Sequence, residues 1–222
     1  MTHTVHPYAH RLTIIRDWKS RWFGTSAKQY RQNLRIDTAL RTYLTKRLRG
    51  LYVTTVEIER GEKELRLNIK TSRPGMVIGR SGENSQKILA DIKKQLRKLR
   101  LGDDMPEIKI DVEEIRSPES HAAIVAYMVA EGLEKRMPHR RILKQTVEKV
   151  MANRDVKGVR IAVSGRLGGA EMSRREELKK GRIPLQTFRA DIDYAKEQAY
   201  LPYGVIGIKV WIYRGEVFDE NK

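Results

Sequence analysis

The 222-residue sequence contains no cysteine and no apolar run long enough to cross a bilayer. Without cysteine the chain cannot build a disulfide scaffold, a cysteine-ligated zinc site or a thiol nucleophile. The longest apolar stretch lies between His121 and Glu131, far short of a membrane helix. Residues 1–18 also lack the apolar core of a signal peptide. These absences predict a soluble intracellular protein that does not span a membrane.

The composition is instead dominated by positive charge. Lys and Arg number 45 against 28 Asp and Glu, a net charge of +17, while 40% of the residues are hydrophobic and can supply a core. Such an excess suits nucleic acid, an anionic membrane surface or an acidic protein. The charge is uneven: residues 1–50 carry +9, residues 51–116 carry +2 and residues 117–222 carry +6. Within the last block, residues 135–189 carry +11. Two basic regions imply at least two contact surfaces on an extended polyanion.

Hydrophobic periodicity divides the chain into helices and strands. Apolar residues at every third or fourth position predict helices over residues 28–49, 83–101, 118–136 and 138–152. Alternating apolar residues predict strands over residues 52–60, 63–71, 107–115, 156–164, 185–195 and 204–214. Residues 165–184, rich in Gly and Arg, are predicted to be a connection.

The same features predict an α+β protein of two domains. Residues 1–25 have weak periodicity but many aromatic and basic side chains, and we interpret them as an arm that docks on another surface. Ser117-Pro118 can open a new helix, so a domain boundary is expected near Arg116. Residues 26–116 then form a basic helix with the first domain, and residues 117–222 form the second.

The most specific motif is VIGRSGENSQKI, residues 77–88. Gly79 lets the backbone turn without a side-chain clash, and Gly82 lets the chain approach a phosphate and opens the next helix. The free amides and the positive dipole end of that helix favour an anion. Arg80 adds a charge and Ser81 a small donor at the loop tip. Such a loop can hold a sugar–phosphate backbone without reading base identity.

The motif and its surroundings, in the order helix, strand, strand, short helix, loop, helix, strand, resemble a type II KH domain. In that family the GXXG loop clamps single-stranded nucleic acid. The resemblance implies a three-stranded sheet with helices on one face, and an RNA-binding role for Gly79, Arg80, Ser81 and Gly82. The alternative is that the two glycines only build a tight helix–helix corner. A P-loop is excluded, because no Gly-Lys-Ser or Gly-Lys-Thr follows at the required spacing.

Three further segments point to one family. They are RLTIIRDWKSRWF at 11–23, SGRLGGAEMSRREELKKGRIPLQTFRADIDYA at 164–195 and YGVIGIKVWIYRGE at 203–216. They are similar to segments of the third protein of the small ribosomal subunit, bacterial type, so the resemblance covers essentially the whole chain. It implies a C-terminal α+β domain with two helices against a mostly antiparallel sheet.

The resemblance also implies a function. The family is a structural constituent of the subunit head, with no bond-making activity and no cofactor, in the cytoplasmic ribosome. The implied partners are 16S rRNA, mRNA at its entry channel, and the tenth and fourteenth proteins of the subunit. Any unwinding of mRNA would be mechanical, with translocation driven by the ribosome.

Arg140, Arg141 and Lys144 form a basic group near the start of a predicted helix. Like charges one turn apart cost about a few tenths of a kcal/mol, which a bound anion would offset. A solvated basic face is the alternative. In relatives the matching residues line the mRNA entry channel, so the resemblance implies that these three side chains grip incoming mRNA.

A second Gly-rich segment is the candidate rRNA contact of the C-terminal domain, through Arg166, Gly168, Gly169, Arg174 and Arg175. Glycine combined with dense arginine suits close packing on structured RNA through phosphate and 2′-hydroxyl contacts. An ordinary hairpin connection is the alternative.

Asp191-x-Asp193 could hold a metal ion or act as a catalytic carboxylate pair. No third carboxylate or histidine lies nearby in sequence, so we expect structural ion pairing, with Arg189 as a candidate partner. Histidines 121 and 139 belong to no evident triad.

Two other functions stay open on the residues alone. A free KH-domain regulator of transcription or ribosome assembly would usually carry repeated KH units or an OB-fold. A nuclease or ATP-dependent enzyme would need a metal-binding carboxylate cluster or a phosphate-binding lysine motif, which the sequence lacks.

Overall fold

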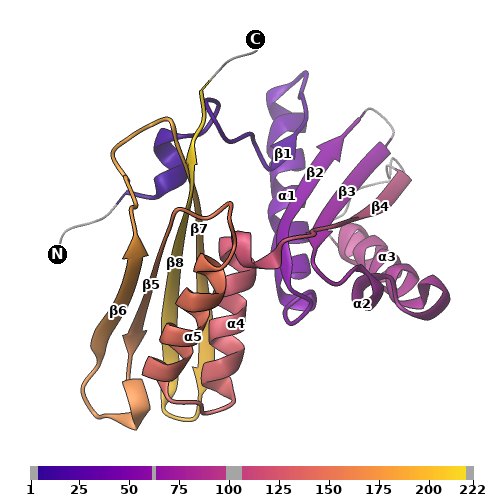
Figure 1. Ribbon diagram of the computed structural model, residues 1–222. Coiled ribbons are helices and arrows are strands. Elements are labelled where there is room, and N and C mark those ends of the chain that lie inside the picture. Colours follow the sequence, from indigo (N-terminus) through magenta and orange to yellow (C-terminus); the bar gives the residue numbers. More distant parts are fainter. Residues whose placement is uncertain (1–4, 62–63, 99–106, 219–222) are drawn as a thin grey trace. The chain divides into compact units, whose positions relative to one another are not determined.

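The computed structural model describes residues 5–61, 64–98 and 107–218, which divide into two compact units (Figure 1). One unit runs from Trp18 to Arg116. The other joins the N-terminal residues up to Asp17 to the residues from Ser117 onward. The segment 1–25, interpreted above as one arm, is therefore divided between the two units.

The unit from Trp18 to Arg116, called the KH unit below, has one mixed sheet. Its elements are β1 (Ser20–Arg21), α1 (Ala27–Arg47), β2 (Val53–Arg60), β3 (Glu64–Thr71), α2 (Pro74–Ile78), the 3-10 helix η2 (Arg80–Gly82), α3 (Glu83–Lys98) and β4 (Glu107–Glu114). The strand order is β1-β2-β3-β4. Strands β2 and β3 are antiparallel, whereas β4 runs parallel to β3 and β1 parallel to β2.

The core of the KH unit lies on one face of this sheet. Leu65, Leu67 and Ile69 alternate along β3 and are fully buried. Apolar residues four apart on α1, such as Leu40 and Leu44, pack into the same cluster together with the apolar stripe of α3. The expected sheet with helices on one face is confirmed, and β1 adds an edge strand too short for periodicity to reveal. The predicted end of the helix at residues 99–101 lies outside the described residues.

The second unit, called the C-terminal unit below, has an antiparallel sheet of order β6-β5-β8-β7. Its elements are η1 (Pro7–His10), η3 (Pro118–Ser120), α4 (Ala122–Glu134), α5 (His139–Met151), β5 (Gly158–Gly165), η4 (Leu167–Gly169), β6 (Arg174–Gly181), β7 (Ala190–Leu201) and β8 (Gly204–Glu216). Both long helices cover the same face of the sheet (Figure 1).

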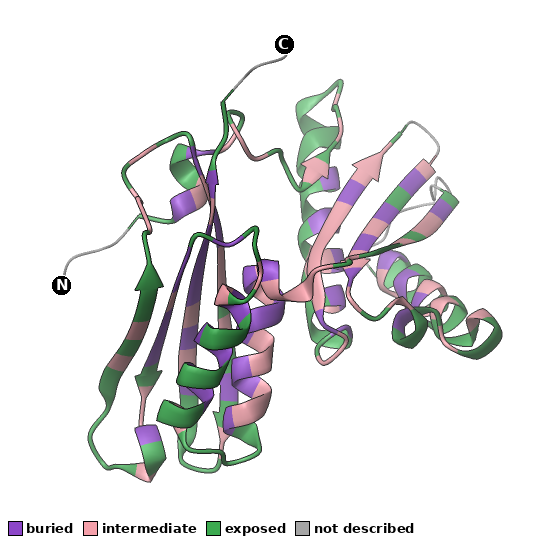
Figure 2. Cartoon of the chain, viewed as in Figure 1, coloured by how far each residue is buried: buried purple, intermediate pink, exposed green. Residues whose placement is uncertain are grey.

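Alternation along each strand of the C-terminal unit sends one set of side chains toward α4 and α5. Ile208 and Val210 of β8 are fully buried in that core, as are Val159 and Ile161 of β5. Helix α4 is rich in alanine and is buried or half-buried along most of its length, whereas the outer side of α5 is exposed (Figure 2). We call the other side of the sheet, which these helices do not cover, the open face.

Two predicted segments of this unit were wrong. The connection predicted over 165–184 contains β6, and the strand predicted over 185–195 is displaced to Ala190–Leu201. Strand β6 reads RREELKKG and lies at the edge of the sheet, where Leu178 is its one residue packed against the core. An edge strand with a single apolar residue carries no period-2 hydrophobic signal. The α+β class itself is confirmed.

The N-terminal segment is tied into the C-terminal unit by Arg11, which is completely buried. Its guanidinium donates to the carbonyl of Ala190 at 2.6 Å, to that of Pro7 at 2.8 Å and to that of Thr187 at 2.8 Å. It also reaches the carbonyls of Pro184 and Leu185. A buried cation is stable only when its donors are satisfied, and this one joins three stretches of backbone.

Candidate nucleic-acid interface

The Gly-Arg-Ser-Gly loop sits between α2 and α3 of the KH unit and depends on a left-handed backbone. Gly79 has φ +77° and Gly82 has φ +79°, and Ser81 between them has φ +52°. A Cβ on Gly79 would lie 2.9 Å from the Cβ of Asn84, too close for any side chain. Position 79 is therefore restricted to glycine by both its φ angle and its surroundings.

Side chains behind the loop hold it in place and leave its tip exposed. The amide of Asn84 donates to the carbonyl of Met76 at 3.1 Å, and the hydroxyl of Ser85 donates to the carbonyl of Gly82 at 2.7 Å. Arg80 and Ser81 are exposed. The loop thus presents one cation and one hydroxyl at the start of α3, where the helix dipole favours an anion.

The basic group on α5 is also exposed, but its three members differ. Arg140 pairs with Glu176 of β6 at 3.3 Å, and the same carboxylate lies 3.0 Å from the Nε2 atom of His139 and 3.4 Å from Arg174. Hydrogen bonding from Arg140 lowers the pKa of Glu176. The anion that offsets the charge of Arg140 is thus part of the protein, which the sequence pattern did not reveal.

Arg141 and Lys144, by contrast, have no ion-pair partner among residues 5–61, 64–98 and 107–218. They project from the side of α5 opposite Leu143 and Val147, which are buried in the core. These two cations are therefore free to meet an external anion.

The second Gly-rich segment is a compact corner rather than a long loop. Arg166 donates to the carbonyl of Ala170 at 2.8 Å and lies over the ring of Tyr203, 5.7 Å from its centroid. Gly168 and Gly169 have φ +69° and +83°. Arg166 therefore stabilises the corner itself, and Tyr203, which sequence reasoning missed, is its exposed aromatic partner.

Arg174 and Arg175 follow this corner on β6 and project to opposite sides of the sheet. Arg174 is on the side of the helices, near Glu176, whereas Arg175 is on the open face and pairs with Glu177 at 2.9 Å. Because consecutive strand residues alternate in direction, the two arginines cannot contact the same ligand from one face.

The two aspartates near the start of β7 are structural. Asp193 is buried, accepts from the backbone N–H of Ala122 at 2.8 Å and from Arg214 at 3.1 Å, and also accepts from the hydroxyl of Tyr8. Burial alone would raise the pKa of Asp193, but the guanidinium groups of Arg16 and Arg214 outweigh it and lower that pKa.

The expectation of ion pairing was right in kind, but Arg189 was the wrong partner. Asp191 pairs with Arg16 at 2.7 Å, whereas Arg189 pairs with Glu216 at 2.6 Å. A β-bulge after Asp191 shifts the register, so Asp191 and Asp193 do not lie on a regular strand. Within the described ranges, no cluster of three or more His, Asp or Glu could hold a metal ion.

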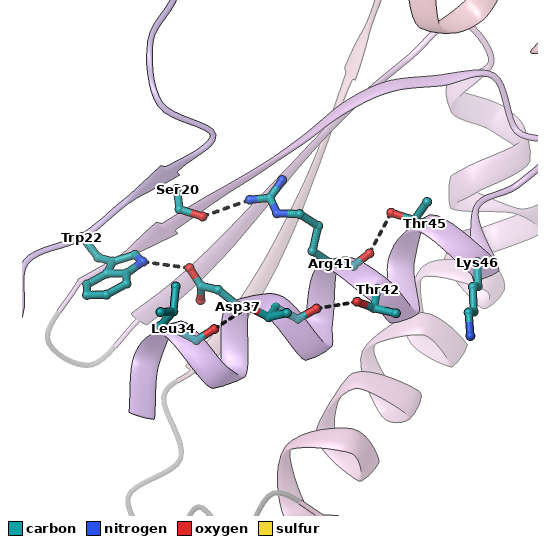
Figure 3. Close-up of a pocket in the computed structure, with 9 residues that line it drawn as sticks. Ser20, Trp22, Leu34, Asp37, Arg41, Thr42, Thr45 and Lys46 are labelled. Carbon is teal, nitrogen blue, oxygen red and sulfur yellow. Dashed lines mark hydrogen bonds between the residues drawn. The ribbon is translucent and has the colours of Figure 1, made fainter. Parts of the chain in front are cut away.

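A groove of about 450 Å³ runs along α1 beside β1, and most of its polar groups are already bonded (Figure 3). The indole of Trp22 donates to Asp37 at 2.8 Å, and Arg41 donates to the hydroxyl of Ser20 at 2.9 Å. Thr42 donates to a main-chain carbonyl one turn earlier. These lining residues do not pair a nucleophile with a general base, so they offer no arrangement for bond-making chemistry.

No helix in the described part of the chain is both long enough and apolar enough to cross a membrane. The candidate contacts that the structure leaves for a large ligand are the exposed ones described above. They lie on the GXXG loop, on α5 and around the corner at Arg166.

Comparison with known proteins gives matches over nearly the whole sequence. Residues 39–120 match the family model described as KH domain, and residues 129–212 match that described as ribosomal protein S3, C-terminal domain. Small ribosomal subunit protein uS3 of Clostridium novyi is 40% identical over 222 residues, which cover 100% of this chain and 96% of that protein. The protein of the same name from Ectopseudomonas mendocina is 43% identical over 217 residues, covering 98% and 91%. That from Oleidesulfovibrio alaskensis is 42% identical over 221 residues, covering 100% and 99%.

Proposed function

The chain belongs to the uS3 family of small ribosomal subunit proteins, and we propose that it binds 16S rRNA in the subunit head and helps to position and unwind mRNA at the entry channel. As a member of this family it is an RNA-binding structural component of the small subunit that serves translation, and it is not an enzyme. The roles assigned below to individual residues are part of the proposal.

The exposed face of α5 carries the proposed mRNA role. Arg141 and Lys144 lie one turn apart on a helix whose other side is anchored in the core. The anchored helix fixes the backbone positions of these two cations, and a phosphate does not have to displace an internal carboxylate to reach them. Arg140 contributes less in this proposal, because an RNA phosphate has to compete with Glu176 for it.

The GXXG loop and the corner at Arg166 are the proposed contacts with other RNA segments. The exposed tip of Arg80 and Ser81 suits one stretch of sugar–phosphate backbone. The corner at Arg166 presents the exposed ring of Tyr203 with basic β6 beside it, which suits structured rRNA. We also propose a cytoplasmic location and contacts with the tenth and fourteenth proteins of the subunit, on the strength of family membership.

Sedimentation tests the proposed place in the particle against the alternative of a free KH-domain regulator. Cell extracts would be run on sucrose gradients at low and high salt, and the chain quantified in each fraction. We expect one copy per small subunit, retained at high salt. A free pool released at low salt would instead support the regulator.

Translation through a stable mRNA hairpin tests the role of α5. The double variant Arg141→Ala/Lys144→Ala should slow translation through the hairpin and leave an unstructured message unaffected. Arg140→Ala alone should have a smaller effect, since its partner Glu176 already holds it. Lys149→Ala, an exposed cation in the last turn of the same helix, is the control. Unimpaired translation by the triple variant of Arg140, Arg141 and Lys144 would contradict the mRNA role.

A further inference from the structure

The open face of the C-terminal sheet carries a pair of lysines that no feature described so far explains. Lys196 of β7 and Lys209 of β8 are direct cross-strand partners in the sheet register. Like charges placed opposite each other destabilise a sheet. Neither lysine forms an ion pair with any residue in the described parts of the chain.

The direction of both side chains follows from strand alternation. Ile208 and Val210 on either side of Lys209 are buried against the helices, so Lys209 projects from the open face. Ala195 packs toward the same core, so Lys196 projects in the same direction as Lys209. Neighbouring strands are about 4.8 Å apart, which brings both ammonium groups within reach of one phosphate.

The residues around this pair add positive charge and do not neutralise it. The register places Glu177, Ala162, Lys209 and Lys196 in one row across the four strands. Glu177 is already bonded by Arg160 at 2.7 Å and by Arg175 at 2.9 Å. The structure describes all four residues of this row, and Glu177 is its only carboxylate. The row therefore contains no carboxylate that neutralises the two lysines.

The surface next to the pair is flat enough for a backbone to approach. In the adjacent row the cross-strand partners are Ser164 and Gly207, and Gly207 has no side chain. Beyond them on β7 the ring of Tyr200 is 54% exposed. A flat floor with cations on one side and an aromatic ring on the other suits a nucleic-acid strand, since phosphates take the charge and a base or ribose packs on the ring.

We propose that this open face, centred on Lys196 and Lys209, is an additional rRNA-binding surface that engages the sugar–phosphate backbone. This inference rests on the proposed function, because its ligand is the rRNA of the small subunit. It assigns that RNA to a face opposite the one that carries α5, so the C-terminal domain contacts RNA from both sides of its sheet.

Binding of the full-length protein to a transcript of the 16S rRNA head region, measured across a series of KCl concentrations, tests the proposal. The variant Lys196→Gln/Lys209→Gln should bind on the order of tenfold more weakly at moderate salt. The slope of log affinity against log salt should fall by about 1.5, as expected when two phosphate contacts are lost. Removing two like charges relieves repulsion, so the variant should fold at least as stably as the parent.

The matched control is Lys70→Gln/Lys109→Gln, two lysines on the open face of the KH sheet that are paired with glutamates at 3.0 Å and 2.8 Å. It should change affinity less than twofold and leave the slope unaltered. Equal losses in the two double variants would overturn the proposal, because they would report net charge alone.

The remaining outcomes separate this proposal from the proposed function. If the parent binds and the Lys196/Lys209 variant binds equally well, the open face is not an RNA site, although the ribosomal role stands. If the variant keeps RNA affinity but no longer binds RNA-free small-subunit proteins, the occupant is a protein and the proposal is wrong. Failure of the parent itself to bind the transcript would contradict both.

Discussion

Each of the two sheets has one face that its α-helices do not cover, and the lysines on these two open faces differ in their partners. On the KH sheet, Lys70 lies 3.0 Å from Glu57, and Lys109 lies 2.8 Å from Glu64. On the C-terminal sheet, Lys196 and Lys209 face each other without a carboxylate. Both faces contain lysines in strands, yet only one of them leaves its lysines available to a polyanion.

The difference between the two open faces helps to show which surfaces leave positive charge available to a polyanion. Residues 51–116 have a formal charge of only +2, and their open face forms ion pairs within the protein. Exposed ion pairs contribute little stability, but they do neutralise the surface. The positive charge of the KH unit therefore lies on α1 and at the GXXG loop rather than on its sheet, whereas the C-terminal sheet keeps unpaired lysines on its open face.

The largest expected loss of stability comes from changing Arg11, whose N-terminal segment packs into the C-terminal unit alone. Arg11→Ala removes a buried cation that five carbonyl groups accept from, and should destabilise the C-terminal unit by about 3–5 kcal/mol. Hydrogen exchange should show lost protection in β7 and β8 and unchanged protection in β2 and β3. Arg21→Ala, which removes an exposed pair with Glu59, should stay within about 0.5 kcal/mol. Equal loss of protection in both units would contradict the claim that Arg11 stabilises the C-terminal unit alone.

Asp193, a buried carboxylate, makes the stability of the C-terminal unit sensitive to acid. Its pKa is lower in the folded than in the unfolded chain, so its stabilising contribution is complete above about pH 4 and is lost as the pH falls through the folded pKa. Asp193→Asn should destabilise the unit by about 2–4 kcal/mol at neutral pH. Urea unfolding followed against pH should show a shallower acid limb for the variant. Parallel acid limbs for parent and variant would show that other carboxylates dominate.

The conformation of the GXXG loop, in contrast, depends on its backbone angles rather than on ion pairs. Gly79→Ala should destabilise the KH unit by about 1–3 kcal/mol, because position 79 has φ +77° and a Cβ would meet Asn84. Gly75→Ala, where no atom lies within 4 Å of an added Cβ, should be neutral or stabilising by up to about 1 kcal/mol. Thermal unfolding of the two variants checks this, and similar losses in both would contradict the geometry.

The smallest expected change in the free energy of unfolding comes from replacing one lysine on each open face, and its sign should differ between the two faces. Lys196→Gln should stabilise the free protein by about 0.2–1 kcal/mol, since it removes a like-charge cross-strand pair. Lys70→Gln should destabilise it by no more than about 1 kcal/mol, since it removes ion pairs. Chemical denaturation at low salt gives the best sensitivity, and the difference should shrink as salt is added. Changes of the same sign at both positions would contradict the comparison.

The sequence predicted the elements that carry strong apolar periodicity. The alternation of Leu65, Leu67 and Ile69 located β3, and the apolar residues four apart located α1, to within one or two residues. The GXXG loop was found from its glycines, and its backbone angles are those that glycine accepts most readily.

Features that depend on tertiary placement could not be predicted. Strand β6 has a polar sequence and exists because it pairs with β5. Arg140 and Glu176, which pair in the structure, are 36 positions apart in the chain, so no local sequence pattern predicts their contact. The lysine pair at 196 and 209 was missed because the predicted strand ended at residue 195, and cross-strand register has no signature in one sequence.

Lysine reactivity in intact small subunits tests most directly whether the unpaired cations of the C-terminal open face are held by RNA. Particles would be treated with an amine-reactive reagent before and after nuclease digestion, and each lysine quantified by mass spectrometry. The account predicts that Lys196 and Lys209 are protected in the intact particle and become several-fold more reactive once the RNA is digested. Equal reactivity of these two lysines before and after digestion would contradict it.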